Sequence, residues 1–205
     1  MKTSMSAYVP VVVTREADGQ TTHQDLYSRL LSDRIIMIDG EIEPHMASIV
    51  VAELLYLQSE DSSKPISMYI SSPGGHCSAG MSIVSTMGLV SCPVRIFAHG
   101  MIASMASVIA SAGERGYRYV LPGTRVMLHQ ASSGTEGNVQ DMRIAMEENL
   151  KVNDMLLEIL AKNCGKTVEE VRKATERDRW LSDAEAVEFG LLDKIVEKRH
   201  NVAQD

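Results

Sequence analysis

Aromatic residues and cysteines are scarce in this chain of 205 residues. It has two Phe, one Trp and six Tyr, so its core must be built mainly from Met, Leu, Ile, Val and Ala. The three cysteines, Cys77, Cys92 and Cys164, are an odd number without CxxC spacing, which argues against a disulfide framework and a zinc site. The histidines form neither an H-x-x-x-H nor an H-E-x-x-H pattern, so the sequence predicts no metal site.

Basic runs and long apolar segments are also missing. Lys and Arg number 20 against 27 Asp and Glu, a formal net charge of −7, and no basic stripe follows the chain, which argues against nucleic acid as the main partner. Residues 1–6 contain no apolar signal core, and no stretch approaches the roughly 18 apolar residues of a membrane span. We expect a soluble, unsecreted protein of the reducing cytoplasm, with no membrane partner.

The apolar pattern predicts a single α/β domain over residues 1–205. Residues 1–22, an apolar patch followed by a polar run, cannot build a core and are expected to form an arm, a flexible loop or a partner contact. After them, a strand, a glycine-containing turn and a helix follow one another twice, which is typical of α/β proteins. The expected strands are 35–38, 66–70, 94–98, 118–121, 125–128 and 191–196, and the expected helices are 24–33, one from Pro44, 79–90, 104–112 and 138–162.

Local signals mark the helices near the C-terminus. Gly165 is placed to end the long helix 138–162. Thr167 with Glu170 and Ser182 with Glu185 have the spacing of capping boxes, and each pair predicts a short helix. A polar segment, residues 176–179, lies between these two helices.

Three segments combine a strand end or a glycine turn with reactive residue types: 72–75, 100–104 and the strand end at His129. Catalytic groups of α/β proteins gather at such places. Serine hydrolysis needs a hydroxyl, a base, a group that orients the base and N–H donors for the oxyanion. Ser104 begins a predicted helix, where N–H groups are unpaired. His129 could act as the base, Asp178 as its orienting group, and Gly75 offers an unobstructed N–H.

Each of these residues also has an ordinary structural interpretation. A serine at a helix start is most often an N-cap, and a histidine is most often a surface or satisfied core residue. Asp178 between Arg177 and Arg179 is typical of a solvated ion pair. The α/β-hydrolase elbow is excluded, because Ile102 and Ala106 replace the glycines of G-x-S-x-G and the order would be Ser, His, Asp. From these residues alone, both interpretations stay open.

Several longer motifs occur in a fixed order along nearly the whole chain. They are Asp25-Leu-Tyr-Ser-Arg-Leu-Leu31, Ile70-Ser-Ser-Pro-Gly-Gly75, Ala79-Gly-Met-Ser-Ile83, Ala103-Ser-Met105, Arg125-Val-Met-Leu-His-Gln130, Thr175-Glu-Arg-Asp-Arg-Trp-Leu-Ser182 and Glu185-Ala-Val-Glu-Phe-Gly-Leu-Leu-Asp193. Through them the chain resembles the ClpP family, the proteolytic subunits of Clp ATP-dependent proteases. The resemblance implies a crotonase-like α/β fold, a spiral of ββα units with a protruding helical handle over about residues 130–162.

Carried over by position, the resemblance implies a catalytic triad and an oxyanion hole. Ser104 would be the nucleophile, His129 the general base and then acid, and Asp178 the residue that orients His129. The N–H groups of Gly75 and Met105 would form the oxyanion hole.

The resemblance also implies residues that bind partners. Ser133 and Gly134 would belong to a strand that aligns the substrate, and Arg177 would form an ion pair between rings. The groove that docks the unfoldase would be lined by Tyr69, Leu89, Phe97, Tyr119 and Val196.

The implied assembly consists of two stacked heptameric rings of this chain around a chamber. Unfolded polypeptides would be cleaved there by serine endopeptidase chemistry, fed by a hexameric AAA+ unfoldase. The unfoldase would use the ATP, so that this chain itself needs no cofactor. Residues 8–22 would form axial loops at the pore, and a propeptide would end between Ser6 and Ala7.

The chain departs from the family pattern in four places. Beside the nucleophile, Met101, Ile102 and Ala106 stand where Gln, Ala and Gly are usual. After Gln130 the usual proline is Ala131, and the glycine-rich strand reads Ser132-Ser133-Gly134-Thr135. Asn149 occupies a commonly apolar site of the handle, and Ser67 and His99 replace larger apolar residues of the docking groove. These changes bear on cleavage preference, ring stability and choice of partner.

Two other functions stay open at this point. Crotonase-type acyl-CoA hydratases and isomerases share the implied fold, although they typically use carboxylate rather than serine chemistry. A non-catalytic or weakly active structural subunit of a mixed ring would result if the four departures had removed independent activity. The complete set of Ser104, His129 and Asp178 argues against the inactive relatives that have lost it.

Overall fold

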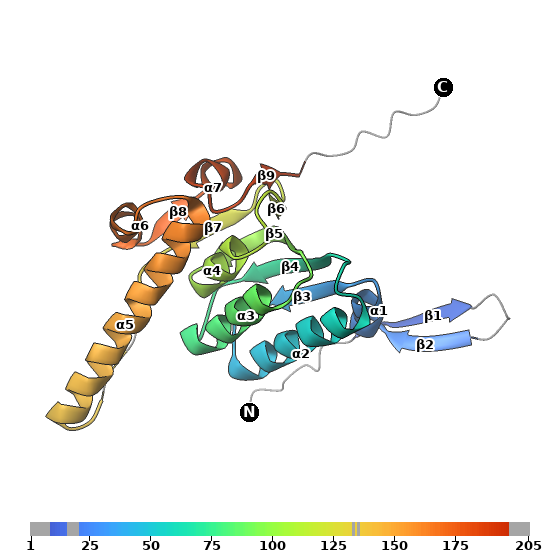
Figure 1. Ribbon diagram of the computed structural model, residues 1–205, viewed down its shortest axis with the longest axis horizontal. Coiled ribbons are helices and arrows are strands. Elements are labelled where there is room, and N and C mark those ends of the chain that lie inside the picture. The colour runs from blue at the N-terminus through green and yellow to red at the C-terminus, as the bar shows by residue number, and fades with distance from the viewer. Residues whose placement is uncertain (1–8, 16–20, 133, 135, 197–205) are drawn as a thin grey trace, which may run out of the picture.

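The fold is mixed α/β and is built around one largely parallel sheet (Figure 1). The structure is a computed structural model that describes residues 9–15, 21–132, 134 and 136–196. Within this part of the chain the sheet has the order β3-β4-β5-β6-β9, while β7 pairs with β5 and β8 pairs with β7. The strands are β3 (Ile35–Asp39), β4 (Ile66–Ser72), β5 (Val94–Ala103), β6 (Arg118–Val120), β7 (Arg125–Leu128), β8 (Arg179–Leu181) and β9 (Lys194–Ile195). All of their pairings are parallel except β7 with β8, which confirms the predicted fold class.

The helices cover the sheet unevenly. They are α1 (Leu26–Ser32), α2 (Pro44–Glu60), α3 (Cys77–Leu89), α4 (Met105–Ser111), α5 (Val139–Cys164), α6 (Val168–Thr175) and α7 (Asp183–Phe189). α2 and α3 lie side by side on one face of the sheet (Figure 1). Along β4, Ile66, Met68 and Ile70 are fully buried and join the core with these helices, whereas Tyr69 is turned to the other face and stays partly exposed. This alternation is the period of a strand that is buried on one side.

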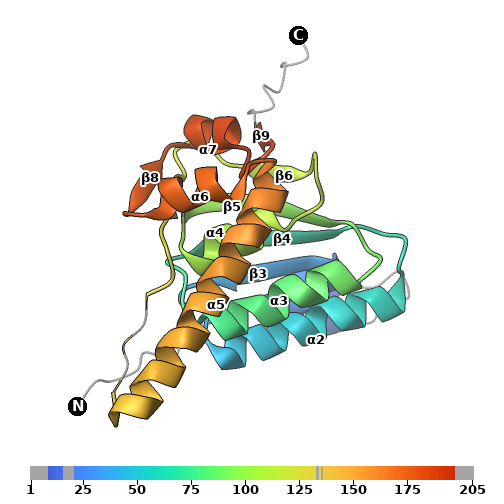
Figure 2. The same cartoon turned by 60° about the vertical axis from the view of Figure 1, so that its left-hand side comes forward.

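The long helix α5 protrudes from the body of the molecule (Figures 1 and 2). Asn138 caps its start by accepting hydrogen bonds from the N–H groups of Gln140 and Asp141, and Gly165 ends it with φ +67°. Its buried residues, Leu156, Leu157, Leu160 and Ala161, all lie in its C-terminal half. The predicted helix 138–162 is therefore confirmed, as are the capping boxes of α6 and α7. No helix among the described residues is long and apolar enough to span a bilayer.

The N-terminal segment contains a hairpin that the sequence analysis did not predict. β1 (Val11–Arg15) pairs antiparallel with β2 (Thr21–Asp25). The predicted helix 24–33 was wrong at its start, because residues 24 and 25 pair with β1 and the helix begins at Leu26. Asp25 caps it by accepting a hydrogen bond from the N–H of Ser28 at 3.0 Å. The expected propeptide boundary after Ser6 lies outside the described residues.

β5 is longer than predicted, and the difference places the nucleophile candidate. The strand was expected to end at Ala98, with Gly100 opening a turn, but it continues to Ala103 through Gly100, whose φ is +61°. The pairing shifts in between, since Ile70 pairs with Ala98 whereas Ser72 pairs with Ile102. Such a bulge lets a strand bend without ending, so the sharp turn comes at residue 104 instead.

Two further strand predictions were wrong near the C-terminus. The strand expected over 191–196 is only β9, because Leu191 and Leu192 are buried in the turn that follows Gly190. β8 was not predicted, since its sequence Arg-Trp-Leu has one buried residue and no alternating apolar pattern.

Candidate active site

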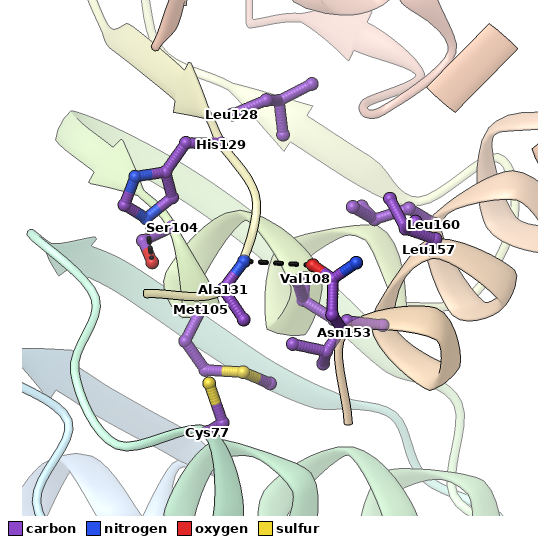
Figure 3. Close-up of a pocket in the computed structure, with 11 residues that line it drawn as sticks. Cys77, Ser104, Met105, Val108, Leu128, His129, Ala131, Asn153, Leu157 and Leu160 are labelled. Carbon is purple, nitrogen blue, oxygen red and sulfur yellow. Dashed lines mark hydrogen bonds between the residues drawn. The ribbon is translucent and has the colours of Figure 1, made fainter. Parts of the chain in front are cut away.

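Ser104 stands at the sharp turn between β5 and α4. Its φ of 56° and ψ of −125° are rare for a residue other than glycine. Its side chain makes no cap hydrogen bond to α4, so the interpretation of Ser104 as an ordinary N-cap is wrong. The hydroxyl instead lies 2.7 Å from Nε2 of His129 (Figure 3).

His129 reaches Ser104 because their strands are neighbours. β7 runs parallel to the end of β5, with Ala103 opposite Met127, so the residues that follow both strands lie at the same edge of the sheet. The N–H of Ser104 also donates to the carbonyl of Met127 at 3.0 Å. The parallel pairing of two short segments thus brings the hydroxyl and the imidazole together.

Asp178 lies on the other side of the imidazole. β8 pairs antiparallel with β7, with Leu128 opposite Arg179, which places Asp178 beside His129. Its Oδ1 is 3.4 Å from Nδ1 of His129, and its side chain is 67% exposed. Among the described residues its ion-pair partner is this histidine rather than an arginine. The distance is slightly longer than that of a well-formed hydrogen bond. Asp178 is therefore close to His129 but loosely held in the single chain.

Gly75 and Met105, the residues expected to form the oxyanion hole, belong to two turns that are in close contact. Ile42 forms a parallel bridge with Gly75. The N–H of Ile42 donates to the carbonyl of Gly74, and the N–H of His76 donates to the carbonyl of Ile42. Because these two bonds flank Gly75, its own N–H points away from Ile42. A Cβ on Gly74 would lie 2.7 Å from Ser104 Cβ and 3.1 Å from the nitrogen of Met105. The glycine turn therefore packs directly on the turn at Ser104, next to the unpaired N–H at the start of α4.

One cavity is lined by Ser104, and a second, larger one shares Cys77 and Ala131 with it. A small pocket of about 20 Å³ is lined by Cys77, Ser104, Met105, Val108, Leu128, His129, Ala131, Asn153, Leu156, Leu157 and Leu160. A larger one of about 760 Å³ is lined by Gly75, Cys77, Met81, Ala131, Val152 and Met155, among others. Burial raises the pKa of the Cys77 thiol. This thiol therefore stays protonated near neutral pH, and Ser104 has no thiolate beside it to compete as a nucleophile.

Comparison with known proteins decides the family. The family model described as "Clp protease" matches residues 18–199. Two relatives, each called ATP-dependent Clp protease proteolytic subunit, come from Streptococcus pyogenes serotype M5 (strain Manfredo) and Streptococcus equi subsp. equi (strain 4047). Each is 45% identical to this chain over 191 residues, which is 92% of this chain and 97% of the relative. The chain belongs to the Clp protease family. The resemblance found in the sequence is thereby confirmed.

Three of the residues expected to line an unfoldase groove lie together in the structure. Tyr69, Phe97 and Tyr119 stack in a row across β4, β5 and β6, with ring centroids 4.7 and 5.1 Å apart. The ring of His99 adjoins the row, 6.4 Å from that of Tyr69. The row lies on the face of the sheet opposite to α2 and α3.

Of the other two expected groove residues, Leu89 does not join this row within one chain. Leu89 ends α3 and is 73% exposed, but α3 covers the other face of the sheet. Val196 follows β9, and its N–H donates to the carbonyl of Val120 at 2.8 Å.

The remaining predicted residues are Arg177, Ser133 and Gly134. Arg177 is exposed, lies near His129 and Asp178, and forms no ion pair within the described part of the chain. Gly134 is exposed and belongs to no strand, and Ser133 lies outside the described residues. The described residues contain no group of three His, Cys, Asp or Glu side chains that could hold a metal ion.

Two supporting residues of this Clp protease site were not found from the sequence. Ser107 is fully buried, and its hydroxyl lies within hydrogen-bond distance of the carbonyl oxygens of Ile102, at 3.2 Å, and Met127, at 3.0 Å. Asn153 accepts a hydrogen bond from the N–H of Ala131 at 3.1 Å. For Ser107, a polar residue within the apolar helix α4 was the available signal, since a buried polar group must find a partner. The identity of that partner depends on the tertiary fold.

Proposed function

We propose that this chain is the proteolytic subunit of an ATP-dependent Clp protease, a serine endopeptidase that hydrolyses peptide bonds of unfolded proteins. The observation that carries the proposal is the 2.7 Å contact between Ser104 Oγ and His129 Nε2 at a strained turn. A strained backbone at a partly exposed residue is a feature of functional sites. The names of the relatives, ATP-dependent Clp protease proteolytic subunit, agree with this chemistry.

Acylation follows from the arrangement of the side chains. His129 takes the hydroxyl proton of Ser104 on Nε2 as Oγ attacks the substrate carbonyl, and the carbonyl oxygen becomes an oxyanion. The N–H groups of Gly75 and Met105 donate hydrogen bonds to this oxyanion. His129 then gives the proton to the leaving amine, while Asp178 stabilises the imidazolium through Nδ1.

Deacylation repeats the same proton transfers with water. His129 takes a proton from water, the hydroxide attacks the acyl-enzyme, and Ser104 Oγ leaves with the proton that His129 returns. In both steps the base is the neutral form of the imidazole. None of these steps uses a cofactor.

Assembly accounts for the apolar side chains that α5 exposes. Val139, Ile144, Met146 and Leu150 are between 53% and 74% exposed. Apolar side chains gathered in this way mark an interaction surface. We assign α5 to the contact between two stacked heptameric rings. A hexameric AAA+ unfoldase in the cytoplasm would feed the chamber and hydrolyse the ATP, docking on the aromatic row of Tyr69, Phe97 and Tyr119.

The decisive experiment is active-site labelling of the purified protein with a fluorophosphonate, followed by mapping of the adduct by mass spectrometry. We expect one adduct on Ser104, absent in Ser104→Ala and abolished in His129→Ala because the unassisted hydroxyl is unreactive. Peptide hydrolysis should be lost in the same variants. An unlabelled Ser104 in assembled wild-type protein would contradict the proposal and support the alternative, a non-catalytic or weakly active structural subunit.

A further inference from the structure

Asn153 lies where the long helix α5 meets the segment that carries His129. Its side-chain Oδ1 accepts a hydrogen bond from the backbone N–H of Ala131, with an N···O distance of 3.1 Å (Figure 3). Asn153 is partly buried and lines the small pocket beside Ser104. A polar side chain of α5 is thus bonded to the backbone that directly follows His129 and Gln130.

The segment after β7 has few anchors. β7 ends at Leu128, so the sheet no longer fixes the backbone at residues 129–131. The N–H of Gln130 donates to the carbonyl of Thr175 at 2.9 Å, and the N–H of Ala131 donates to Asn153. The first bond joins two backbone groups, whereas the second depends on a side chain and can be removed by one substitution.

The position of Asn153 on α5 gives this bond a mechanical consequence. The buried residues of α5 begin at Leu156, while Val139, Ile144 and Leu150 towards its other end are exposed. Asn153 therefore sits where the helix leaves the body of the molecule. A displacement of the protruding part would reach the His129 segment through this contact.

The bond is also matched to the residue at position 131. Ala131 stands where the family resemblance gives proline, and proline has no N–H to donate. The N–H that alanine supplies faces a pocket whose other walls include Val108 and Leu157. A donor left unsatisfied in such a place is destabilising, and Oδ1 of Asn153 satisfies it.

We propose that Asn153 is a positioning residue, which fixes the backbone at Ala131 and so keeps the imidazole of His129 aligned with Ser104. It acts through His129 and touches none of the reacting atoms. The inference rests on the proposed peptidase activity and deepens it by naming the α5 side chain that holds the base in place.

Three variants on one helical turn test this proposal. Asn153→Leu keeps the side chain's branched shape and removes the acceptor, whereas Asn153→Asp keeps an acceptor oxygen. Asp154→Asn is the control, since it breaks only the exposed ion pair with Arg172 at 3.0 Å. We expect Asn153→Leu to lower kcat about tenfold, the effect of about 1.4 kcal/mol on a barrier. KM should change less than about twofold, because a misplaced base affects the transition state rather than substrate binding.

The two remaining variants separate positioning from a general structural role. Asn153→Asp should retain most of the wild-type kcat, and Asp154→Asn should match the wild type. Thermal unfolding and sedimentation are measured for each variant. Loss of kcat that accompanies loss of the assembled form in Asn153→Leu would overturn the proposal, because the residue would then act in assembly.

The route through Ala131 is tested by Ala131→Pro, which removes the N–H donor. In a protein that carries Ala131→Pro, the hydrogen bond between residues 131 and 153 is already absent. Adding Asn153→Leu should therefore leave kcat at the value of Ala131→Pro alone. An equal fall in both backgrounds would overturn the proposal. If Ser104 is labelled in the wild-type protein but Asn153→Leu has the wild-type kcat, only this inference fails. If Ser104 stays unlabelled in the wild-type protein, the proposed peptidase activity fails and this inference fails with it.

Discussion

Replacing Gly75 by alanine tests the proposed oxyanion hole most directly. An added Cβ would lie 2.4 Å from the carbonyl oxygen of Ile42 and 2.8 Å from its nitrogen, and φ at Gly75 is +150°. Real Cβ contacts are essentially never shorter than 3.0 Å, and both neighbouring atoms are backbone. The turn must therefore move away from Ile42 by at least about 0.6 Å, and the N–H of Gly75 moves with it.

This displacement is large compared with the tolerance of an oxyanion hole. Donors act when they lie about 2.7 to 3.1 Å from the oxyanion, and the loss of one donor lowers kcat by about 10² to 10³, or about 2.7 to 4 kcal/mol. We expect Gly75→Ala to lower kcat within this range and to change KM much less, since the oxyanion exists only in the transition state and the tetrahedral intermediate.

The assay is steady-state hydrolysis of a short fluorogenic peptide, with thermal unfolding measured in parallel. Gly88→Ala is the matched control, because no atom lies within 4 Å of its added Cβ and alanine in α3 should stabilise the helix by about 0.5 to 1 kcal/mol. If Gly75→Ala keeps kcat within about twofold of the wild type while remaining folded, the N–H of Gly75 is not an oxyanion donor and the reasoning from donor geometry is refuted.

Three further predictions concern the rest of the chain. Asp178→Asn should lower kcat by about 10²-fold, less than the roughly 10⁴-fold of a buried triad aspartate, because its side chain is 67% exposed and 3.4 Å from His129; an effect near 10⁴ in the assembled protein would contradict this. Asp193→Asn should lower the free energy of unfolding by about 3 to 5 kcal/mol, measured by urea denaturation, because Arg118 is 3% exposed and would lose its ion pair at 2.6 Å. Burial raises the pKa of Asp193, but hydrogen bonds and charge from Arg118 outweigh it and hold the pKa below its usual value, so this stabilisation is present above the usual carboxyl range and is lost as the pH falls through the lowered pKa. Gly165 has φ +67°, so Gly165→Ala should introduce backbone strain of about 1 kcal/mol and lower the melting temperature. An unchanged melting temperature would contradict this prediction.

The parts of the fold that sequence predicted correctly are those fixed by local signals. The strand β7 and the helix α5 were found because their apolar spacing and caps lie within a few residues of each other. The hairpin of β1 and β2 was missed, because its residues are polar or exposed and only pairing with each other makes them strands. β5 was cut short because Gly100 is a turn signal, whereas the neighbouring strand holds the chain extended through a bulge.

The same distinction applies to the active site. Ser104, His129 and Asp178 could be named from motifs, but spacing alone did not separate them from a cap, a core histidine and a surface ion pair. Their proximity depends on β7 pairing with both β5 and β8. The contact of Asn153 with Ala131 had no local signal, since the two residues belong to different elements and are joined by one hydrogen bond.

The strained backbone at Ser104 is held by residues outside the set of Ser104, His129 and Asp178. A non-glycine residue at φ 56° and ψ −125° costs about 1 to 3 kcal/mol, and it persists only when its surroundings fix it. Three contacts do so here: the N–H of Ser104 donates to Met127 at 3.0 Å, the hydroxyl of Ser107 joins the ends of β5 and β7, and Gly74 packs against the turn with no room for a side chain. Relaxing any of them would let the hydroxyl turn towards the N-cap position that the sequence alone favours. The hydroxyl is thus directed at His129 by the sheet and the glycine turn rather than by the triad itself.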